Sequence, residues 1–219
     1  MDISINTQLK KYIEEKILPQ YNLNDKGHGI NHINYVIRRC FELVEQNNLD
    51  INSNMIFLIA AYHDIGHHIN PKEHEIISAD IMIKDENLKQ FFSTEELLIM
   101  KEAIEDHRAS SKNEPRSIYG KLISSADRNN TVEQCLERSF YYGKRLEPTA
   151  SNRELYERAF KHLNAKFGYN GYAKFYLKDR EYEDFLDNIR QILKDKEEFC
   201  KLQEAYIKKI ESEGKNEEG

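Results

Sequence analysis

Residues 55–68 read MIFLIAAYHDIGHH, and this stretch decides the fold class. Its first eight residues are apolar around the whole circumference of a helix, which predicts a central, buried helix. His63 and Asp64 follow directly, although an imidazole and a carboxylate cost free energy when they are buried without partners. The end of a helix carries partial negative charge, which favours a nearby cation. We therefore expect His63 and Asp64 to share a divalent ion, and Gly66 to end the helix in a left-handed cap.

Helical spacing of apolar residues continues on both sides of this stretch, for example from Ile33 to Val44. Ser93 and Glu96 match a capping box at the start of another helix. The 219 residues include nine Gly and four Pro, few for an all-β chain, and no strand pattern is evident. The predicted fold class is therefore all-α, a helical bundle with additional C-terminal helices. Further helices are expected at residues 4–18 (ending near Pro19), 71–83, 118–142, 152–166 and 179–211.

The predicted division of the chain is a core at residues 1–146 and a helical extension at 147–219 that packs on it. The tail from about residue 212 is polar and charged, which predicts disorder. The extension is rich in Tyr and Phe. These aromatic residues are compatible with core packing, with a cover for the site that stacks a base, or with a homodimer contact, and the three alternatives stay open.

Composition restricts the partners. The formal charge of −6 argues against broad nucleic-acid binding but leaves room for a small anionic substrate. The longest apolar run, residues 55–62, is too short to span a bilayer, and the N-terminus lacks the pattern of a signal peptide, so no membrane association is expected. Cys40, Cys135 and Cys200 are far apart in sequence, and no Cys-x-x-Cys pair occurs. Cys40 and Cys135 lie in amphipathic stretches, which predicts buried free thiols at these two positions and fits a cytoplasmic location.

Four more imidazole or carboxylate side chains lie on apolar stripes of their predicted helices. His32, His74, His107 and Asp127 are each three or four residues from apolar neighbours, so each is expected to point inward. A single inward histidine is usually a core residue with a backbone partner, but five helices directing such groups inward are much less common by chance. Imidazole and carboxylate ligands together suit Mn, Fe, Co, Ni, Zn or Mg.

The ordered set His32, His63-Asp64 and Asp127 resembles the signature of HD-domain metal-dependent phosphohydrolases. The resemblance covers about residues 26–130 and includes the local strings HGINHINYVIRR, IAAYHDIGHH, HEIISA, AIEDHR and LISSADR. It implies a helical bundle in which those four residues hold a divalent metal ion. Some members hold a second ion through two further histidines, whose places His74 and His107 occupy, so that one or two ions are expected and Asp64 would bridge them.

Other residues near these ligands are candidates for catalysis. His28 and His67 could donate a proton to a leaving group, and Asp64 acts through the metal. Arginine and lysine near the ligands could hold phosphate oxygens. The phosphate-binding candidates are Lys72, Arg108, Arg116 and Arg128.

The resulting prediction is hydrolysis of a phosphate ester or phosphoanhydride, with a nucleotide or related phosphorylated metabolite as substrate. One alternative is a catalytically silent, metal-stabilised module that binds a nucleotide or a protein. Another is a di-iron oxygenase. The chain contains no phosphate-binding Gly-x-x-x-x-Gly-Lys-Ser/Thr loop, which argues against an ATP-driven motor, and no His-Glu-x-x-His helix of the zinc-protease kind.

Overall fold

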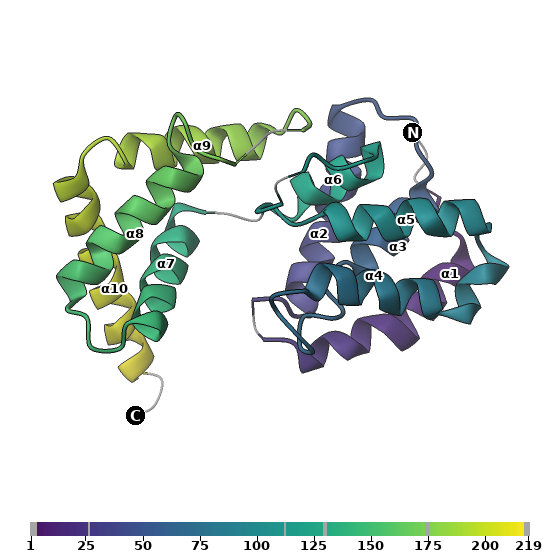
Figure 1. Cartoon of the computed structure of the whole chain (residues 1–219), viewed down its shortest axis with the longest axis horizontal. Helices are drawn as coiled ribbons and strands as arrows, with labels where there is room; N and C mark the ends of the chain where they lie inside the picture. Colours follow the sequence, from purple (N-terminus) through teal and green to yellow (C-terminus); the bar gives the residue numbers. More distant parts are fainter. Residues whose placement is uncertain (1–3, 26, 112, 129–130, 174–175, 217–219) are drawn as a thin grey trace. The chain divides into compact units, whose positions relative to one another are not determined.

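The computed structural model describes residues 4–25, 27–111, 113–128, 131–173 and 176–216. Over this part of the chain it contains ten α-helices, a few short π and 3₁₀ segments and no strand (Figure 1). The predicted all-α fold class is therefore confirmed. Packing divides the chain into two units. Unit 1 comprises residues 1–129 and 175–179, and unit 2 comprises residues 130–174 and 180–219.

Unit 1 is built around the apolar helix of the opening stretch, α3, whose residues 55–62 are all buried. Helices α2, α5 and α6 pack against α3, so the predicted central position of this helix is confirmed. The elements of unit 1 are α1 (Thr7–Tyr12), a π segment (Ile13–Ile17), a 3₁₀ segment (Leu18–Leu23), α2 (Ile30–Gln46), α3 (Ser53–Tyr62), α4 (His74–Lys84), a 3₁₀ segment (Glu86–Gln90), α5 (Thr94–Asp106) and α6 (Ile118–Ala126).

The ends of these helices follow local capping chemistry. Asn6 accepts hydrogen bonds from two N–H groups of α1, and Ser93 with Glu96 forms the predicted capping box of α5. Pro19 was expected to stop the first helix, and the α and π turns do end at Ile17, two residues before it. The chain then continues as a 3₁₀ segment to Leu23. Pro19 lies in the first turn of that segment, where its missing N–H has no helical partner to lose.

The prediction that Gly66 forms a left-handed cap is wrong, because its φ is not positive. The reason for a glycine here is close packing. A Cβ at this position would lie 2.6 Å from Ile77 Cγ2 and 2.9 Å from the backbone nitrogen of Ser78, both on α4. The backbone N–H of Gly66 also donates a 2.9 Å hydrogen bond to Ser78 Oγ. Gly66 thus lets the turn after His63-Asp64 lie directly against α4.

Unit 2 has its own core of buried residues, separate from that of unit 1. The helix predicted from residue 118 to 142 is interrupted, because Asp127 ends α6 and Thr131 caps a new helix through a capping box with Gln134. Asn129 and Asn130 lie outside the described residues. The elements of unit 2 are α7 (Val132–Leu146), α8 (Asn152–Phe167), α9 (Arg180–Ile192) and α10 (Lys196–Asn216).

Two predicted boundaries in this part of the chain need correction. The core was expected to extend to residue 146, but α7 packs on α8 and α10, which places it in unit 2. The single helix predicted for residues 179–211 is two helices, because Asp195 accepts hydrogen bonds from two backbone N–H groups of α10 and starts it afresh. Helix α10 continues past residue 212 to Asn216, and the rest of the predicted disordered tail, 217–219, lies outside the described residues.

The three cysteines are buried free thiols, as predicted for Cys40 and Cys135. Among the helices described, none has both the length and the apolar composition that crossing a bilayer requires.

Candidate metal centre

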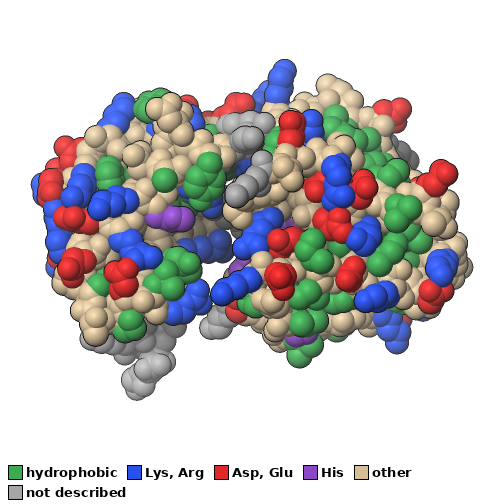
Figure 2. Space-filling model, in the orientation of Figure 1, with side chains coloured by type: hydrophobic (Ala, Val, Ile, Leu, Met, Phe, Trp, Pro, Cys, Tyr) green, Lys and Arg blue, Asp and Glu red, His purple; other side chains and the backbone are tan. Residues whose placement is uncertain are grey.

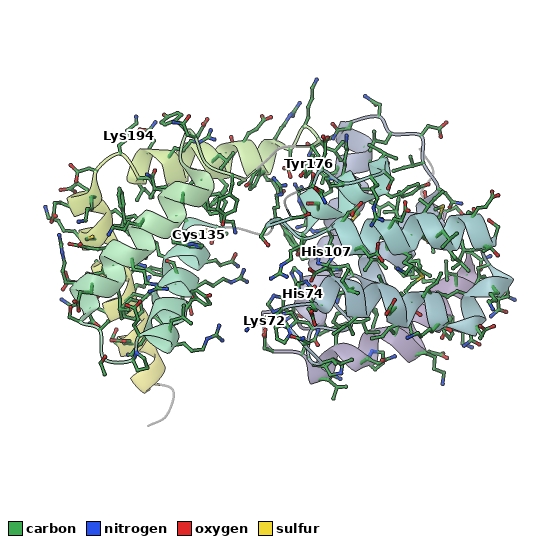
Figure 3. The ribbon with its side chains drawn as sticks, viewed as in Figure 1. Lys72, His74, His107, Cys135, Tyr176 and Lys194 are labelled. Carbon is green, nitrogen blue, oxygen red and sulfur yellow. The ribbon has the colours of Figure 1, made fainter. Side chains whose placement is uncertain are left out.

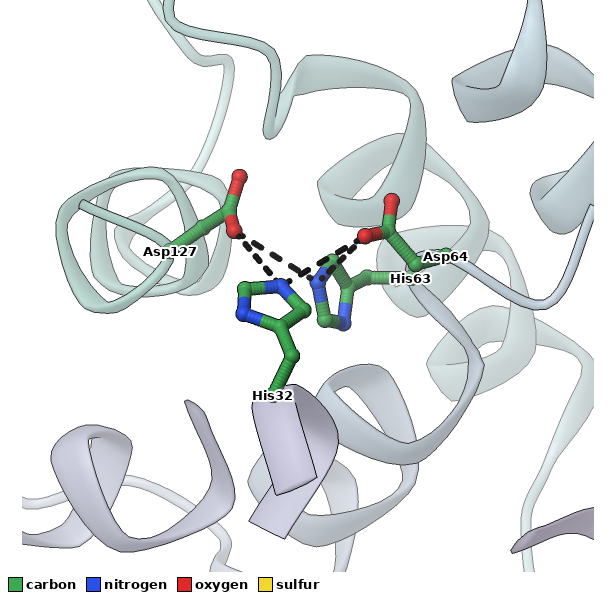
Figure 4. Close-up of side chains that lie close together, drawn as sticks. All are labelled: His32, His63, Asp64 and Asp127. Carbon is green, nitrogen blue, oxygen red and sulfur yellow. Dashed lines mark ion pairs between the residues drawn. The ribbon is translucent and has the colours of Figure 1, made fainter. Parts of the chain in front are cut away.

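Four side chains predicted as ligands converge in unit 1 (Figure 4). One ligand atom from each of His32, His63, Asp64 and Asp127 can be chosen so that all lie within 4.8 Å of one another. His32 Nε2 lies 3.1 Å from Asp127 Oδ1 and 3.5 Å from Asp64 Oδ2. His63 Nε2 lies 3.5 Å from Asp64 Oδ2 and 3.7 Å from Asp127 Oδ1. The structure therefore brings together residues that are up to 95 positions apart in sequence.

Helix ends position this cluster. His63 is the C-cap of α3, Asp127 is the C-cap of α6, and His32 lies in the first turn of α2. The C-terminal ends of α3 and α6 carry partial negative charge, which adds to that of the two carboxylates. Two of the three helix ends therefore favour a cation at this position, whereas the N-terminal end of α2 carries partial positive charge.

A second cluster shares Asp64 with the first and adds His74 and His107. Asp64 Oδ1 lies 3.2 Å from His74 Nε2 and 3.5 Å from His107 Nε2, whereas its Oδ2 faces the first cluster. The two imidazoles come from the N-terminal end of α4 and the C-terminal end of α5, and their Nε2 atoms are 3.1 Å apart (Figure 3). Asp64 thus presents one oxygen to each cluster.

Backbone carbonyls fix the orientation of three of these imidazoles. The Nδ1 atoms of His63, His74 and His107 lie 2.8, 3.0 and 2.6 Å from the carbonyl oxygens of residues 60, 71 and 104. Since a carbonyl only accepts, each Nδ1 carries a proton, and Nε2 is the nitrogen directed at the cluster. The carboxylates of Glu105 and Asp106, the two residues before His107, bind Lys101 and Arg116.

Polar atoms at the centre lack well-aligned hydrogen-bonding partners. The atoms His32 Nε2, His63 Nε2 and Asp64 Oδ1 are buried and meet no partner in hydrogen-bonding geometry. A buried polar atom left without such a partner costs about 1–3 kcal/mol. Divalent ions bound among these atoms would satisfy all of them together, so the residues present fit a metal centre.

Electrostatics keeps the carboxylates ionised. Burial alone would raise the pKa of Asp64, but His63, His107 and His32 hold it well below its usual range. The pKa of Asp127 is lowered in the same way, against the effect of burial, by His32 and His63. Burial would lower the pKa of His32, yet Asp127 and Asp64 raise it to about 10. The site therefore has a strong preference for positive charge.

The third group consists of His28 and His67, both predicted, and Asp25, which sequence reasoning missed. Asp25 Oδ1 accepts hydrogen bonds from the backbone N–H groups of Gly27 and His28, and it lies 2.9 Å from His28 Nδ1. This is an Asx turn, and an Asp three residues before a histidine in a Gly-containing loop is the signal that could have revealed it. The Asp25 carboxylate contacts His28 through Nδ1, so Nε2 is the ring nitrogen left to contact another group.

The His28 and His67 rings lie against both clusters. They stack on each other with 3.7 Å between centroids and 18° between planes. The His28 ring is 5.9 Å from that of His32, and the His67 ring is 5.3 Å from that of His74. Burial and the neighbouring His28 lower the pKa of His67. The stacked pair thus borders the two clusters from one side.

The predicted phosphate-binding residues have different surroundings. The Arg108 guanidinium lies 3.2 Å from Glu75 on α4 and donates to the backbone carbonyl of Lys72, whose side chain is exposed. Since Glu75 is next to His74, Arg108 and Lys72 border the second cluster. Arg128 directly follows Asp127 and donates from Nε to the carbonyl of Ser124.

Arg116 requires a correction. Its guanidinium binds Asp106 and Glu105 on α5, and both carboxylates lie outside the three clusters. Glu102 Oε1 lies 3.6 Å away as well, so three carboxylates of α5 compensate its charge. Arg116 therefore fastens the segment before α6 to α5 and is not retained as a phosphate ligand.

These observations define an all-α protein with a buried His/Asp centre able to bind divalent metal. Comparison with known protein families matches residues 29–130 to the HD domain, so the chain contains an HD domain that spans all four residues of the first cluster. The HD domain belongs to a superfamily that consists largely of metal-dependent phosphohydrolases. Neither the curated proteins nor the solved structures gave a significant match to the chain.

Proposed function

We propose that this protein is a metal-dependent phosphohydrolase that cleaves a phosphate ester or phosphoanhydride of a nucleotide or related phosphorylated metabolite. The convergence, in an HD domain, of buried imidazole and carboxylate atoms that lack well-aligned partners carries the proposal. Figure 2 supports a small substrate, because acidic and basic side chains are interspersed on the face it shows, whereas a polyanion would require many clustered cations.

In this proposal His32, His63, Asp64 and Asp127 would hold one divalent ion. Asp64, His74 and His107 would hold a second. Divalent ions in such a site supply charge neutralisation for a phosphate and activation of water. The carboxylates stay ionised without any ion because the surrounding imidazoles lower their pKa values, so the site is charged for binding at neutral pH.

The protein groups around the ions bind the substrate and move a proton. Lys72, Arg108 and Arg128 would contact phosphate oxygens, where a guanidinium can bind two oxygens at once. His28, oriented by Asp25 through Nδ1, would donate a proton from Nε2 to the departing oxygen, with His67 stacked on it as the alternative donor.

An activity screen tests the proposal directly. The protein, loaded in turn with Mn, Fe, Co, Ni, Mg or Zn, is assayed with nucleotides and simple phosphate esters for release of phosphate. The Asp64→Ala variant should be inactive, and the His162→Ala variant should match the wild type because His162 is an exposed histidine of α8 in unit 2. Turnover that survives in Asp64→Ala, or metal-loaded protein inert toward the whole panel, contradicts the proposal. Iron-dependent oxygen consumption would instead favour the oxygenase alternative.

A second experiment tests the proton donor. His28→Ala should slow hydrolysis of alkyl phosphates, whose leaving group needs a proton, by roughly 10²-fold or more. The hydrolysis rate of p-nitrophenyl phosphate should change far less, because its leaving group departs without a proton. If the hydrolysis rate fell equally for both substrates, His28 would not be the proton donor.

A further inference from the structure

Residues 176–179 belong to unit 1, although the chain around them belongs to unit 2. We call this segment, Tyr176–Asp179, the strap. It lies well beyond residue 130, where the match to the HD domain ends, so the strap is an addition to that domain. Its Leu177 packs against the core of unit 1.

Two anchors on α2 hold the strap. Asp179 is 3% exposed and accepts a 2.6 Å hydrogen bond from Nη2 of Arg39, itself 2% exposed. Burial of both partners makes this ion pair a firm contact, because removing either one would leave an uncompensated charge. Asn47, at the end of α2, donates to the Lys178 carbonyl and accepts from the Lys178 N–H, both at 2.9 Å. The strap therefore has a fixed position on the same helix that carries His32.

The first residue of the strap lies against the end of α6. The Arg128 guanidinium carbon is 5.4 Å from the centroid of the Tyr176 ring, within the range of a cation–π contact (Figure 3 labels Tyr176). Arg128 is also held through Nε by the Ser124 carbonyl at 3.0 Å. The guanidinium next to Asp127 is thus located by its own helix and by the aromatic ring of the strap.

We propose that the strap is a substrate-positioning element, and that Tyr176 acts as a positioning residue by holding the Arg128 guanidinium where a phosphate group of the substrate binds. The proposal rests on the phosphate-binding role given to Arg128 in the proposed function. An arginine that is oriented in advance loses less side-chain freedom on binding, so holding it raises affinity without any new contact to the ligand. Tyr176 itself need not touch the phosphate.

The chain offers a matched control for this contact. In unit 2 the Arg145 guanidinium carbon lies 5.4 Å from the Tyr142 ring, the same separation, on α7. Tyr142→Ala removes an equivalent arginine–tyrosine pair that has no part in the proposed site.

The test measures binding of inorganic phosphate to metal-loaded protein by calorimetry, together with metal content, so it does not depend on turnover. Tyr176→Ala should weaken phosphate binding by roughly three- to tenfold, with metal content unchanged, and Tyr176→Phe, which keeps the ring, should stay within about twofold of the wild type. Tyr142→Ala should leave the affinity unchanged. In an Arg128→Ala background, Tyr176→Ala should have no further effect.

Three results would overturn the inference. The first is unchanged phosphate affinity in Tyr176→Ala, and the second is the same loss from Tyr176→Ala with and without Arg128. The third is loss of metal in Tyr176→Ala, which would make the strap a structural support for Asp127. If the protein binds phosphate as expected but hydrolyses nothing, the proposed function fails while the positioning role stands.

Discussion

The two units bury polar side chains in opposite ways. Within the described residues, unit 2 buries Ser139 and Gln203, both neutral. Gln203 donates to the Leu136 carbonyl and to Ser139 Oγ, and its Oε1 is the buried polar atom in the described part of this unit that has no hydrogen-bonding partner. Unit 1 buries His63, Asp64 and His107 with their side-chain nitrogen and oxygen atoms directed at one another. Both units are helical and apolar inside, so the fold does not require this arrangement. The difference indicates that the buried imidazoles and carboxylate of unit 1 are kept for a ligand, whereas the neutral buried side chains of unit 2 serve packing.

The largest expected effect comes from the shared carboxylate. Asp64→Ala should abolish metal binding and reduce phosphate release by more than about 100-fold, since even the outer partners of metal ligands contribute up to that much. The helices should persist in circular dichroism because α3 is apolar. Gln203→Met, the counterpart in unit 2, should keep both metal and activity. If Asp64→Ala contained as much metal as the wild type, the claim that unit 1, unlike unit 2, buries polar side chains for a metal ion would be contradicted.

Metal binding by the second cluster can be tested independently of metal binding by the first. His107→Ala or His74→Ala should each lower the metal content from two ions per chain to one, because each removes a ligand from a three-residue group. The first cluster keeps its four residues. Elemental analysis of protein purified without chelator measures this. Two ions retained in both variants would contradict the assignment of a second ion to His74 and His107.

Protonation of the first cluster predicts a pH dependence. The pKa of His32 is raised to about 10 by Asp127 and Asp64, so this imidazole is protonated in the metal-free protein at neutral pH. Metal must displace that proton, so apparent affinity should rise with pH, by about tenfold per unit for one proton, and level off near pH 10. Calorimetry at pH 7 in buffers of different ionisation enthalpy should report release of about one proton, and no release would contradict the prediction.

The smallest effect concerns the turn after His63-Asp64. Gly66→Ala would force a Cβ to 2.6 Å from Ile77 Cγ2, and overpacking of this kind costs about 1–3 kcal/mol of unfolding free energy. Gly143→Ala on α7 is the counterpart in unit 2, where the nearest atoms, at 3.3 and 3.4 Å, belong to the flexible side chains of Leu155 and Arg158. There the higher helix propensity of Ala should offset the contact to within about 1 kcal/mol. Denaturant unfolding of both variants measures the difference, and equal costs would contradict it.

Sequence reasoning predicted the all-α class and the central helix because both depend on local periodicity, which residues 55–62 display. The inward direction of His32, His74, His107 and Asp127 also followed from spacing along single helices. The convergence of these residues agrees with the prediction, while their metal-binding roles remain proposals.

The features that sequence reasoning missed depend on contacts between distant segments. Gly66 was assigned a local conformational role, but its close contact with α4 becomes visible only when the two segments are packed. Arg116 looked like a phosphate ligand beside the last predicted ligand helix, and its acidic partners on α5 were not apparent. The strap is a further case, because nothing near Tyr176 in sequence indicates that Arg39 and Asn47 hold it.

Metal content of the purified protein tests the central claim most directly. The wild-type chain, purified without chelator and analysed for transition metals and magnesium, should contain two divalent ions per chain, and the Asp64→Ala variant should contain none. A wild-type chain that stays free of metal after incubation with each candidate ion, while correctly folded, would contradict the assignment of these buried imidazoles and carboxylates to a metal centre.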